Sequence, residues 1–161
     1  IMEKLSVNAE VYGVATAQEE VGLKGAKTSS FAVNPDFALI VDTTTAGDVP
    51  GIEGKVSSLK LGEGIAITII EASGRGTIVN NKIRKMMIEA ARENKIKHQI
   101  DVIDGGMTDG ATIYINREGI LTGILSLPTR YLHASSSVFN MKDLDAAVEL
   151  GIKTIEKFVK L

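Results

Sequence analysis

Apolar residues along the chain form two patterns, short unbroken runs and longer stretches at helical spacing. The unbroken runs predict strands over residues 10–16, 37–41, 65–70, 99–103 and 121–127. Helical spacing predicts helices over residues 21–31, 77–94, 111–116 and 140–161. Because strands alternate with helices, we expect a three-layer α/β/α domain with a mostly parallel or mixed central sheet.

Two adjacent carboxylates, Glu19 and Glu20, follow the first predicted strand. Side chains of a regular strand alternate between its faces, so both acids cannot face solvent if the strand continues through them. We therefore expect the chain to leave the strand here and to present both acids at the carboxyl edge of the sheet. Ligand sites of open α/β sheets gather at that edge.

Three further strands are followed by an acid or an imidazole, namely Asp42, Asp109 and His133. Together with the two glutamates, these residues suit a site for zinc, cobalt or manganese with oxygen and imidazole ligands. Each position also has a simpler interpretation, because the glutamates could form a solvated turn, Asp42 could bond a turn backbone and His133 could be a surface or packed residue. The residues alone leave these alternatives open.

Composition narrows the function classes. The chain has 161 residues, a net charge of −2, interspersed charges and no cysteine. These features argue against nucleic acid or a membrane surface as main partner, and they exclude thiolate chemistry. No apolar run approaches the ~20 residues that span a bilayer, so we expect a cytoplasmic protein. The chain opens with Ile1-Met2, which is consistent with a single domain or with a segment of a longer polypeptide.

The stretch Val14-Ala15-Thr16-Ala17-Gln18-Glu19-Glu20-Val21-Gly22-Leu23-Lys24-Gly25-Ala26 resembles the signature of the tetrahedral and glutamyl aminopeptidases. These are two-metal peptidases, some of whose members are labelled endoglucanases. The resemblance continues in order over the whole chain, through Pro35-Asp36-Phe37, Val41-Asp42, Ala46-Gly47-Asp48-Val49-Pro50-Gly51, Leu61-Gly62-Glu63-Gly64, Gly105-Gly106-Met107-Thr108-Asp109 and Pro128-Thr129-Arg130-Tyr131-Leu132-His133.

The resemblance implies a role for each residue of a zinc-peptidase-like site. Glu19 would be the general base, and Glu20, Asp42 and His133 would be metal ligands for two divalent ions, zinc or cobalt. The side chains that would lie near the peptide substrate are Thr108, Asp109 and Arg130. Relatives form tetrahedral shells from dimers, so the resemblance also implies a homo-oligomer in the full-length form.

The chain departs from the family pattern in two ways. Met107, Gly110 and Ala134 stand where glycine, alanine and serine are usual. The family's first metal-binding histidine and its metal-bridging aspartate lie upstream of the Glu-Glu motif, and no His or Asp precedes Glu19 here. The inserted dimerisation domain is missing as well. We therefore expect the carboxyl-terminal part of a larger catalytic domain, or a truncated relative that is inactive alone.

Three functions follow from these observations. The first is a metal-dependent aminopeptidase that removes residues from the amino end of peptides. The second is a non-catalytic remnant that serves as an assembly or binding module. The third is a glycosidase, since paired carboxylates also serve glycosyl transfer; it ranks last, because the acids are adjacent and the aromatic content is 4% without tryptophan.

Overall fold

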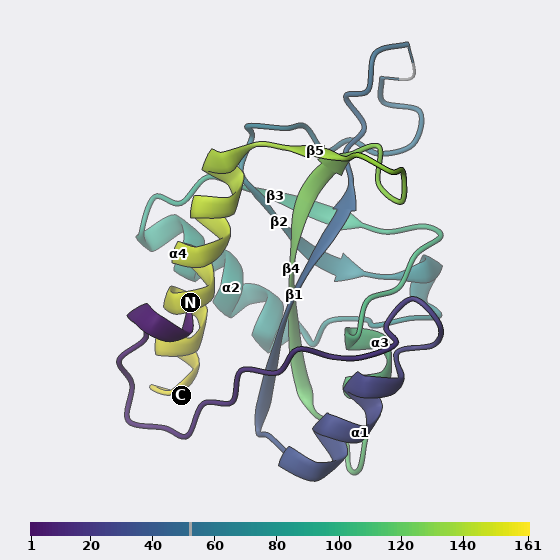
Figure 1. Cartoon of the computed structure of the whole chain (residues 1–161). Helices are drawn as coiled ribbons and strands as arrows, with labels where there is room; N and C mark the ends of the chain where they lie inside the picture. Colours follow the sequence, from purple (N-terminus) through teal and green to yellow (C-terminus); the bar gives the residue numbers. More distant parts are fainter. Residues whose placement is uncertain (52) are drawn as a thin grey trace.

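A computed structural model describes residues 1–51 and 53–161 (Figure 1). The described residues form helices and strands in the following order: η1 (Met2–Lys4), α1 (Lys24–Val33), β1 (Phe37–Thr45), β2 (Ile65–Ile70), η2 (Ala72–Gly74), α2 (Asn81–Glu93), β3 (His98–Val102), α3 (Gly110–Ile113), β4 (Leu121–Arg130), β5 (Val138–Phe139) and α4 (Met141–Phe158).

The strands form one mixed sheet of five, in the order β1-β4-β2-β3, with β5 paired to β4. β1 runs parallel to β4 and β2 parallel to β3, whereas β4 is antiparallel to both β2 and β5. In the β1–β4 register, Ile40 lies opposite Ile124 and Asp42 opposite Ser126. Strands alternate with helices as the apolar pattern predicts, so the expected α/β fold class is confirmed.

The helices pack against the two faces of the sheet (Figure 1). A methyl group on Gly123 of β4 would meet Met87 and Ile83, so α2 packs on this face. Phe37 stacks on Phe158 with ring centroids 4.5 Å apart, which brings α4 to the same face. α3 approaches Ile124, and successive residues of a strand face opposite sides. The sheet is therefore covered by α2 and α4 on one face and by α3, with α1 beyond it, on the other.

Two asparagines cap the long helices. The side chain of Asn80 accepts a hydrogen bond from the Lys82 amide at the start of α2, and Asn140 does the same for Lys142 in α4. The prediction from Asn140 is confirmed. The prediction that Thr77 caps a helix is wrong, because α2 begins at Asn81 with Asn80 as its cap. Thr77 lies in a buried turn before the helix, where its amide donates to Oε2 of Glu71.

The predicted strand over residues 10–16 is also wrong. This segment has no strand partner among the described residues, and Tyr12 and Val14 are exposed. An extended segment without a neighbour has nowhere to place its backbone hydrogen bonds except in solvent. Glu19 and Glu20 therefore do not follow a strand of the sheet.

Two strands extend beyond their predicted ends. β1 continues through Thr45, so Asp42 lies inside the strand rather than after it. β4 continues through Pro128 to Arg130. Its pairing with β2 ends at Ser126, whereas β1 remains the partner opposite Pro128. The proline therefore lies where β2 no longer pairs with β4, so its missing amide hydrogen does not break that pairing.

The predicted short helix is present as α3, and the last helix ends at Phe158 rather than at Leu161. Among the described residues, the helices are too short or too polar to cross a bilayer.

Candidate functional site

The Glu19–Glu20 pair lies in a tight turn that leads into α1. The amides of Gly22 and Leu23 both donate to the carbonyl oxygen of Glu19, at 3.1 and 2.9 Å. Gly22 has a φ of 118°, which glycine adopts without steric cost. The turn replaces the expected strand end and still presents both carboxylates, with Glu19 half-buried and Glu20 exposed.

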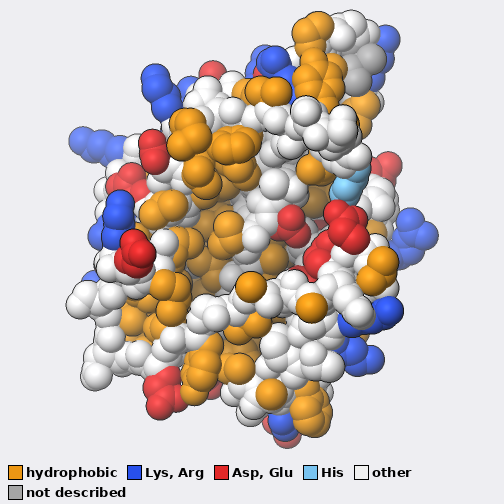
Figure 2. Space-filling model, viewed as in Figure 1, with side chains coloured by type: hydrophobic (Ala, Val, Ile, Leu, Met, Phe, Trp, Pro, Cys, Tyr) orange, Lys and Arg blue, Asp and Glu red, His pale blue; other side chains and the backbone are white. Residues whose placement is uncertain are grey.

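Glu20 lies beside His133. Oε1 of Glu20 is 3.4 Å from Nδ1 of His133, and both side chains are mostly exposed, at 73% and 69%. His133 belongs to the turn that follows β4 and has a φ of 66°. Figure 2 shows acidic side chains gathered beside a histidine on this face of the molecule.

Negative charge gathers around Glu19. Partial burial is the largest cause that raises the pKa of Glu19 above its ordinary value. The nearby carboxylates of Asp42, Glu20 and Asp109 raise this pKa further, while the imidazole of His133 lowers it. The structure thus brings these five side chains within electrostatic range of one another.

Asp42 enters the cluster from β1. Burial raises the pKa of Asp42, and the hydrogen bond from the Thr43 amide to Oδ1, 2.7 Å long, opposes that increase. The charges of Asp109, Glu71 and Glu20 also raise this pKa. Carboxylates that destabilise one another in this way gain when a cation lies among them.

The donor atoms fit a metal ion in part. Ligands on neighbouring corners of a tetrahedral zinc site, each about 2.0–2.1 Å from the metal, are about 3.3 Å apart. The 3.4 Å between Glu20 and His133 matches this spacing. Within residues 1–51 and 53–161, however, no three His, Cys, Asp or Glu side chains are placed to hold one ion together. The charge of Asp42 acts on Glu19 and Glu20, but Asp42 does not complete such a group.

Thr108 and Asp109, predicted to lie near substrate, are almost fully buried, at 3% and 8% exposure. The Thr108 amide donates to Oε1 of Glu71 at 2.8 Å. Oδ2 of Asp109 accepts a 2.6 Å hydrogen bond from the hydroxyl of Thr16. Both residues therefore support the cluster from within the fold, and a contact of either with substrate stays a prediction.

Arg130, also predicted to lie near substrate, forms a two-pronged ion pair with Asp48. Its Nε is 3.0 Å from Oδ1 and its Nη2 is 2.6 Å from Oδ2. The guanidinium holds the pKa of Asp48 below its usual range. The pair ties the end of β4 to the loop after β1, and any role of Arg130 toward substrate stays a prediction.

Two buried acids near the site were missed by the sequence patterns. Glu71 is fully buried and directly follows the apolar run of β2, the same signal that identified Asp42. Asp101 of β3 accepts hydrogen bonds from the hydroxyls of Thr44 and Thr68 at 2.9 and 3.1 Å. Thr68 also lies 2.7 Å from Ser126 across the sheet. The pattern could have indicated Glu71, whereas the Asp101 network depends on pairing between strands distant in sequence.

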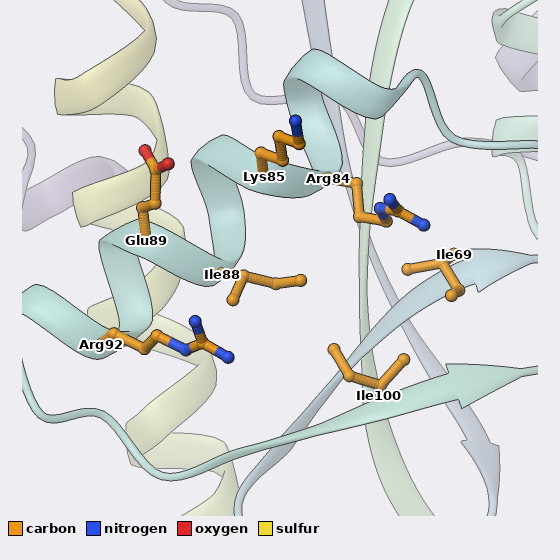
Figure 3. A pocket seen from close by; sticks show the side chains of 7 residues that line it. All are labelled: Ile69, Arg84, Lys85, Ile88, Glu89, Arg92 and Ile100. Atoms are coloured by element: carbon orange, nitrogen blue, oxygen red, sulfur yellow. The ribbon is translucent and has the colours of Figure 1, made fainter.

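A surface groove lies away from these carboxylates, between α2 and β3 (Figure 3). Ile69, Ile88 and Ile100 line its floor, with Arg84 and Arg92 at its rim. None of the predicted site residues contributes to it.

A family model describing the M42 glutamyl aminopeptidases matches residues 1–150. The chain belongs to this family. Members of the family use two divalent metal ions, which agrees with a site built from carboxylates and a histidine.

Sequences and solved structures agree with this membership. The chain is 33% identical over 150 residues to the lysyl aminopeptidase of Pyrococcus furiosus, covering 92% of this chain and 41% of that protein. It is 43% identical, with a TM-score of 0.84, to aminopeptidase APDkam598 from the archaeon Desulfurococcus kamchatkensis, covering 88% of this chain and 40% of that one.

Two more distant structures bear on assembly and naming. The TET1 peptidase of Pyrococcus horikoshii can assemble into a tetrahedron or a large octahedral shell; it is 30% identical, with a TM-score of 0.70, over 89% of this chain and 39% of that chain. A Thermotoga maritima protein named endoglucanase is 27% identical, with a TM-score of 0.63, over 84% of this chain and 39% of that chain. The chain spans 34% to 46% of the length of the curated relatives that it matches.

Proposed function

We propose that this chain is part of a metal-dependent aminopeptidase that hydrolyses the first peptide bond of its substrates. The observation that carries the proposal is the pair formed by Glu20 and His133, two ligand-type side chains at the spacing of neighbouring zinc ligands, 3.4 Å. Glu19 lies next to this pair in the same turn. Family membership supports the same reaction.

Glu20, His133 and Asp42 are the residues of this chain that would hold metal. Two divalent ions, zinc or cobalt, supply an acidified water and polarise the scissile carbonyl when bound. Carboxylate and imidazole donors suit either ion. Glu20, His133 and Asp42 would supply three ligands, which is fewer than two metal ions require. We therefore propose that the remaining ligands come from polypeptide outside this chain.

Glu19 is the proposed general base. Its carboxylate is half-buried among other acids, and both burial and those charges raise its pKa. A carboxylate that hydrogen-bonds the attacking water without ligating a metal can take its proton and pass it to the leaving amine, and this is the role proposed for Glu19. The adjacent Glu20, turned toward His133, is left for ligation. Adjacent residues with two different environments thus take two different tasks.

The substrates are peptides with a free amino end, and the full-length form is proposed to be a homo-oligomer. The lysyl and glutamyl names of relatives support the substrate class. The assembly of the Pyrococcus horikoshii TET1 peptidase supports the oligomer. A cytoplasmic location is part of the same proposal.

A second candidate is a non-catalytic module that keeps the fold. The observation that favours it is the lack, among the described residues, of three donors grouped around one point. A glycosidase remains the weakest candidate: a relative carries the name endoglucanase, but two adjacent carboxylates in one turn are a poor acid/base pair for a glycosidic bond, and the chain has no tryptophan to stack on a sugar ring.

Metal titration separates these candidates. Calorimetry with Zn²⁺ and Co²⁺ is done on the 161-residue chain and on a polypeptide of the length of its relatives, followed by assays on amino-acid amides. The proposal predicts binding that Asp42→Asn weakens and that Asp36→Asn, an exposed control in the turn before β1, leaves unchanged. If the longer polypeptide neither binds metal nor hydrolyses amides, the aminopeptidase proposal is wrong and the module is favoured.

A further inference from the structure

We propose that Asp109 and Glu71 are positioning residues that hold the Glu19–Glu20 turn through Thr16. The inference rests on the proposed function, because it concerns how that site is kept in place. It differs from the expectation that Asp109 contacts substrate, since Asp109 is nearly buried, at 8% exposure. Three connected layers of hydrogen bonds carry the argument.

The first layer joins the turn to Asp109. The hydroxyl of Thr16 donates to Oδ2 of Asp109 at 2.6 Å. A hydrogen bond to a carboxylate is about twice as strong as one between neutral groups. Thr16 immediately precedes Ala17, where the tight turn begins, so the bond fixes the entry to the turn. The other oxygen of Asp109, Oδ1, is buried and has no hydrogen-bond partner among the described residues.

The second layer joins Asp109 to the end of β2. Glu71 is fully buried, and its two carboxylate oxygens accept the amides of Thr108 and Thr77 at 2.8 and 3.2 Å. Thr108 is the residue before Asp109. The amide of Ala72 also donates to the carbonyl of Gly106, at 3.0 Å. Glu71 and its neighbour therefore hold the loop that carries Asp109 against the central sheet.

The third layer closes the turn at its exit. The Gly25 amide donates to the carbonyl of Ala17 at 2.8 Å. A methyl group on Gly25 would lie 2.4 Å from the Ala17 nitrogen, so the first turn of α1 sits directly on the entry to the Glu19–Glu20 turn. With its entry held by Asp109 and its exit by α1, the turn has a fixed position. The chain thereby keeps Glu19 near the carboxylates that raise its pKa.

Hydrogen exchange on the metal-free chain tests this inference apart from the proposed function. Thr16→Val keeps the shape and removes the hydroxyl, whereas Thr16→Ser keeps the hydroxyl. We expect Thr16→Val to speed exchange at the Gly22, Leu23 and Gly25 amides by about tenfold or more. Thr16→Ser should exchange like the parent chain. Glu71→Gln should speed exchange both in this turn and at the Thr108 amide.

A matched control is Asp143→Asn. Asp143 is also a fully buried carboxylate, and it accepts the amides of Gly62 and Gly64 at 2.7 and 2.8 Å, at the start of α4. It should change exchange in residues 62–64 and leave the Glu19–Glu20 turn unchanged. Equal exchange in Thr16→Val and Thr16→Ser overturns the inference, as does an equal effect of Asp143→Asn on the turn.

A kinetic measurement on the longer polypeptide gives the second readout. If the turn is positioned through Thr16, Thr16→Val lowers kcat by about tenfold or more with little change in KM, and Thr16→Ser restores kcat. A fall in KM and kcat that Thr16→Ser does not restore contradicts positioning. If the parent polypeptide has no activity, the proposed function fails, and the exchange experiment still decides the positioning role on its own.

Discussion

Glu20 and His133 come from opposite ends of the chain, and Oε1 of Glu20 lies 3.4 Å from Nδ1 of His133. Both side chains are mostly exposed, so their burial does not drive the contact. The backbone brings them together: the turn before α1 and the turn after β4 meet on the face of the sheet that Asp42 also shares. The same distance also lies within ion-pair range, and the proposed function places a metal ion between the two donors.

Replacing His133 tests its part in metal binding. His133→Gln should weaken Zn²⁺ binding by at least about tenfold, because an imidazole ligand is lost. Binding to the parent should also weaken on acidification, since metal ligands must be deprotonated. Calorimetry measures both effects. His98→Gln is the matched control, because His98 lies in β3 with Nδ1 3.0 Å from the Ile96 carbonyl; an equal loss in both variants would contradict the assignment.

A methyl group at Gly25 should disturb the Glu19–Glu20 turn. The Cβ of Gly25→Ala would lie 2.4 Å from a backbone nitrogen of Ala17, which cannot move without moving the turn. We expect a loss of about 1–3 kcal/mol in the free energy of unfolding and weaker metal binding. Urea denaturation and calorimetry measure these. Gly105→Ala, where nothing lies within 4 Å of the added Cβ, should change neither; similar losses in the two variants would show that glycine loss, rather than the clash, is responsible.

The ion pair of Arg130 and Asp48 predicts a pH dependence of stability. Since Arg130 lowers the pKa of Asp48, the folded state binds fewer protons than the unfolded state in acid. The stabilisation is present above the ordinary pKa of aspartate and is lost as pH falls through the lowered one. Arg130→Gln should reduce stability at pH 7 and flatten the loss below about pH 4. Urea denaturation at several pH values tests this. The control is Arg92→Gln, which removes an exposed side chain that forms no ion pair among the described residues, and it should keep the parent profile.

The buried Asp101 predicts a pH dependence of stability of the opposite sign. Burial raises its pKa despite the hydroxyls of Thr44 and Thr68, so its favourable contribution is present below the ordinary pKa and is lost as pH rises through the raised value. Asp101→Asn keeps an acceptor for both hydroxyls and removes the buried charge. At pH 7 this variant should be at least as stable as the parent, whereas Asp101→Ala should lose about 1–3 kcal/mol. Denaturation at pH 7 in which Asp101→Asn is as unstable as Asp101→Ala would refute this account.

Local sequence patterns predicted those helices and strands whose apolar residues are buried in the core. The apolar run over residues 65–70 coincides with β2 because Ile65 and Ile67 are buried in the central sheet. Ile83, Met86 and Met87 lie on the buried face of α2, as their spacing indicates. In both cases the pattern reports burial directly, so it is sufficient.

Features that depend on distant partners could not be predicted in the same way. The run over residues 10–16 has strand composition, but composition does not show whether a neighbouring strand is present. Pro128 suggests a loop, yet β4 continues through it because β1 still pairs on one side. The Glu19–Glu20 pair can be identified from its chemistry. The hydrogen bond from Thr16 to Asp109 beside it cannot, because it joins segments that are distant in the sequence.

The central claim is that Glu19 moves a proton while Glu20, Asp42 and His133 hold metal. The most direct measurement compares the parent and Glu19→Gln forms of the polypeptide that contains the whole site, in bound metal and in turnover of amino-acid amides. The account predicts unchanged metal content and a fall in kcat of at least about 100-fold in Glu19→Gln. Unchanged turnover with full metal content would contradict it.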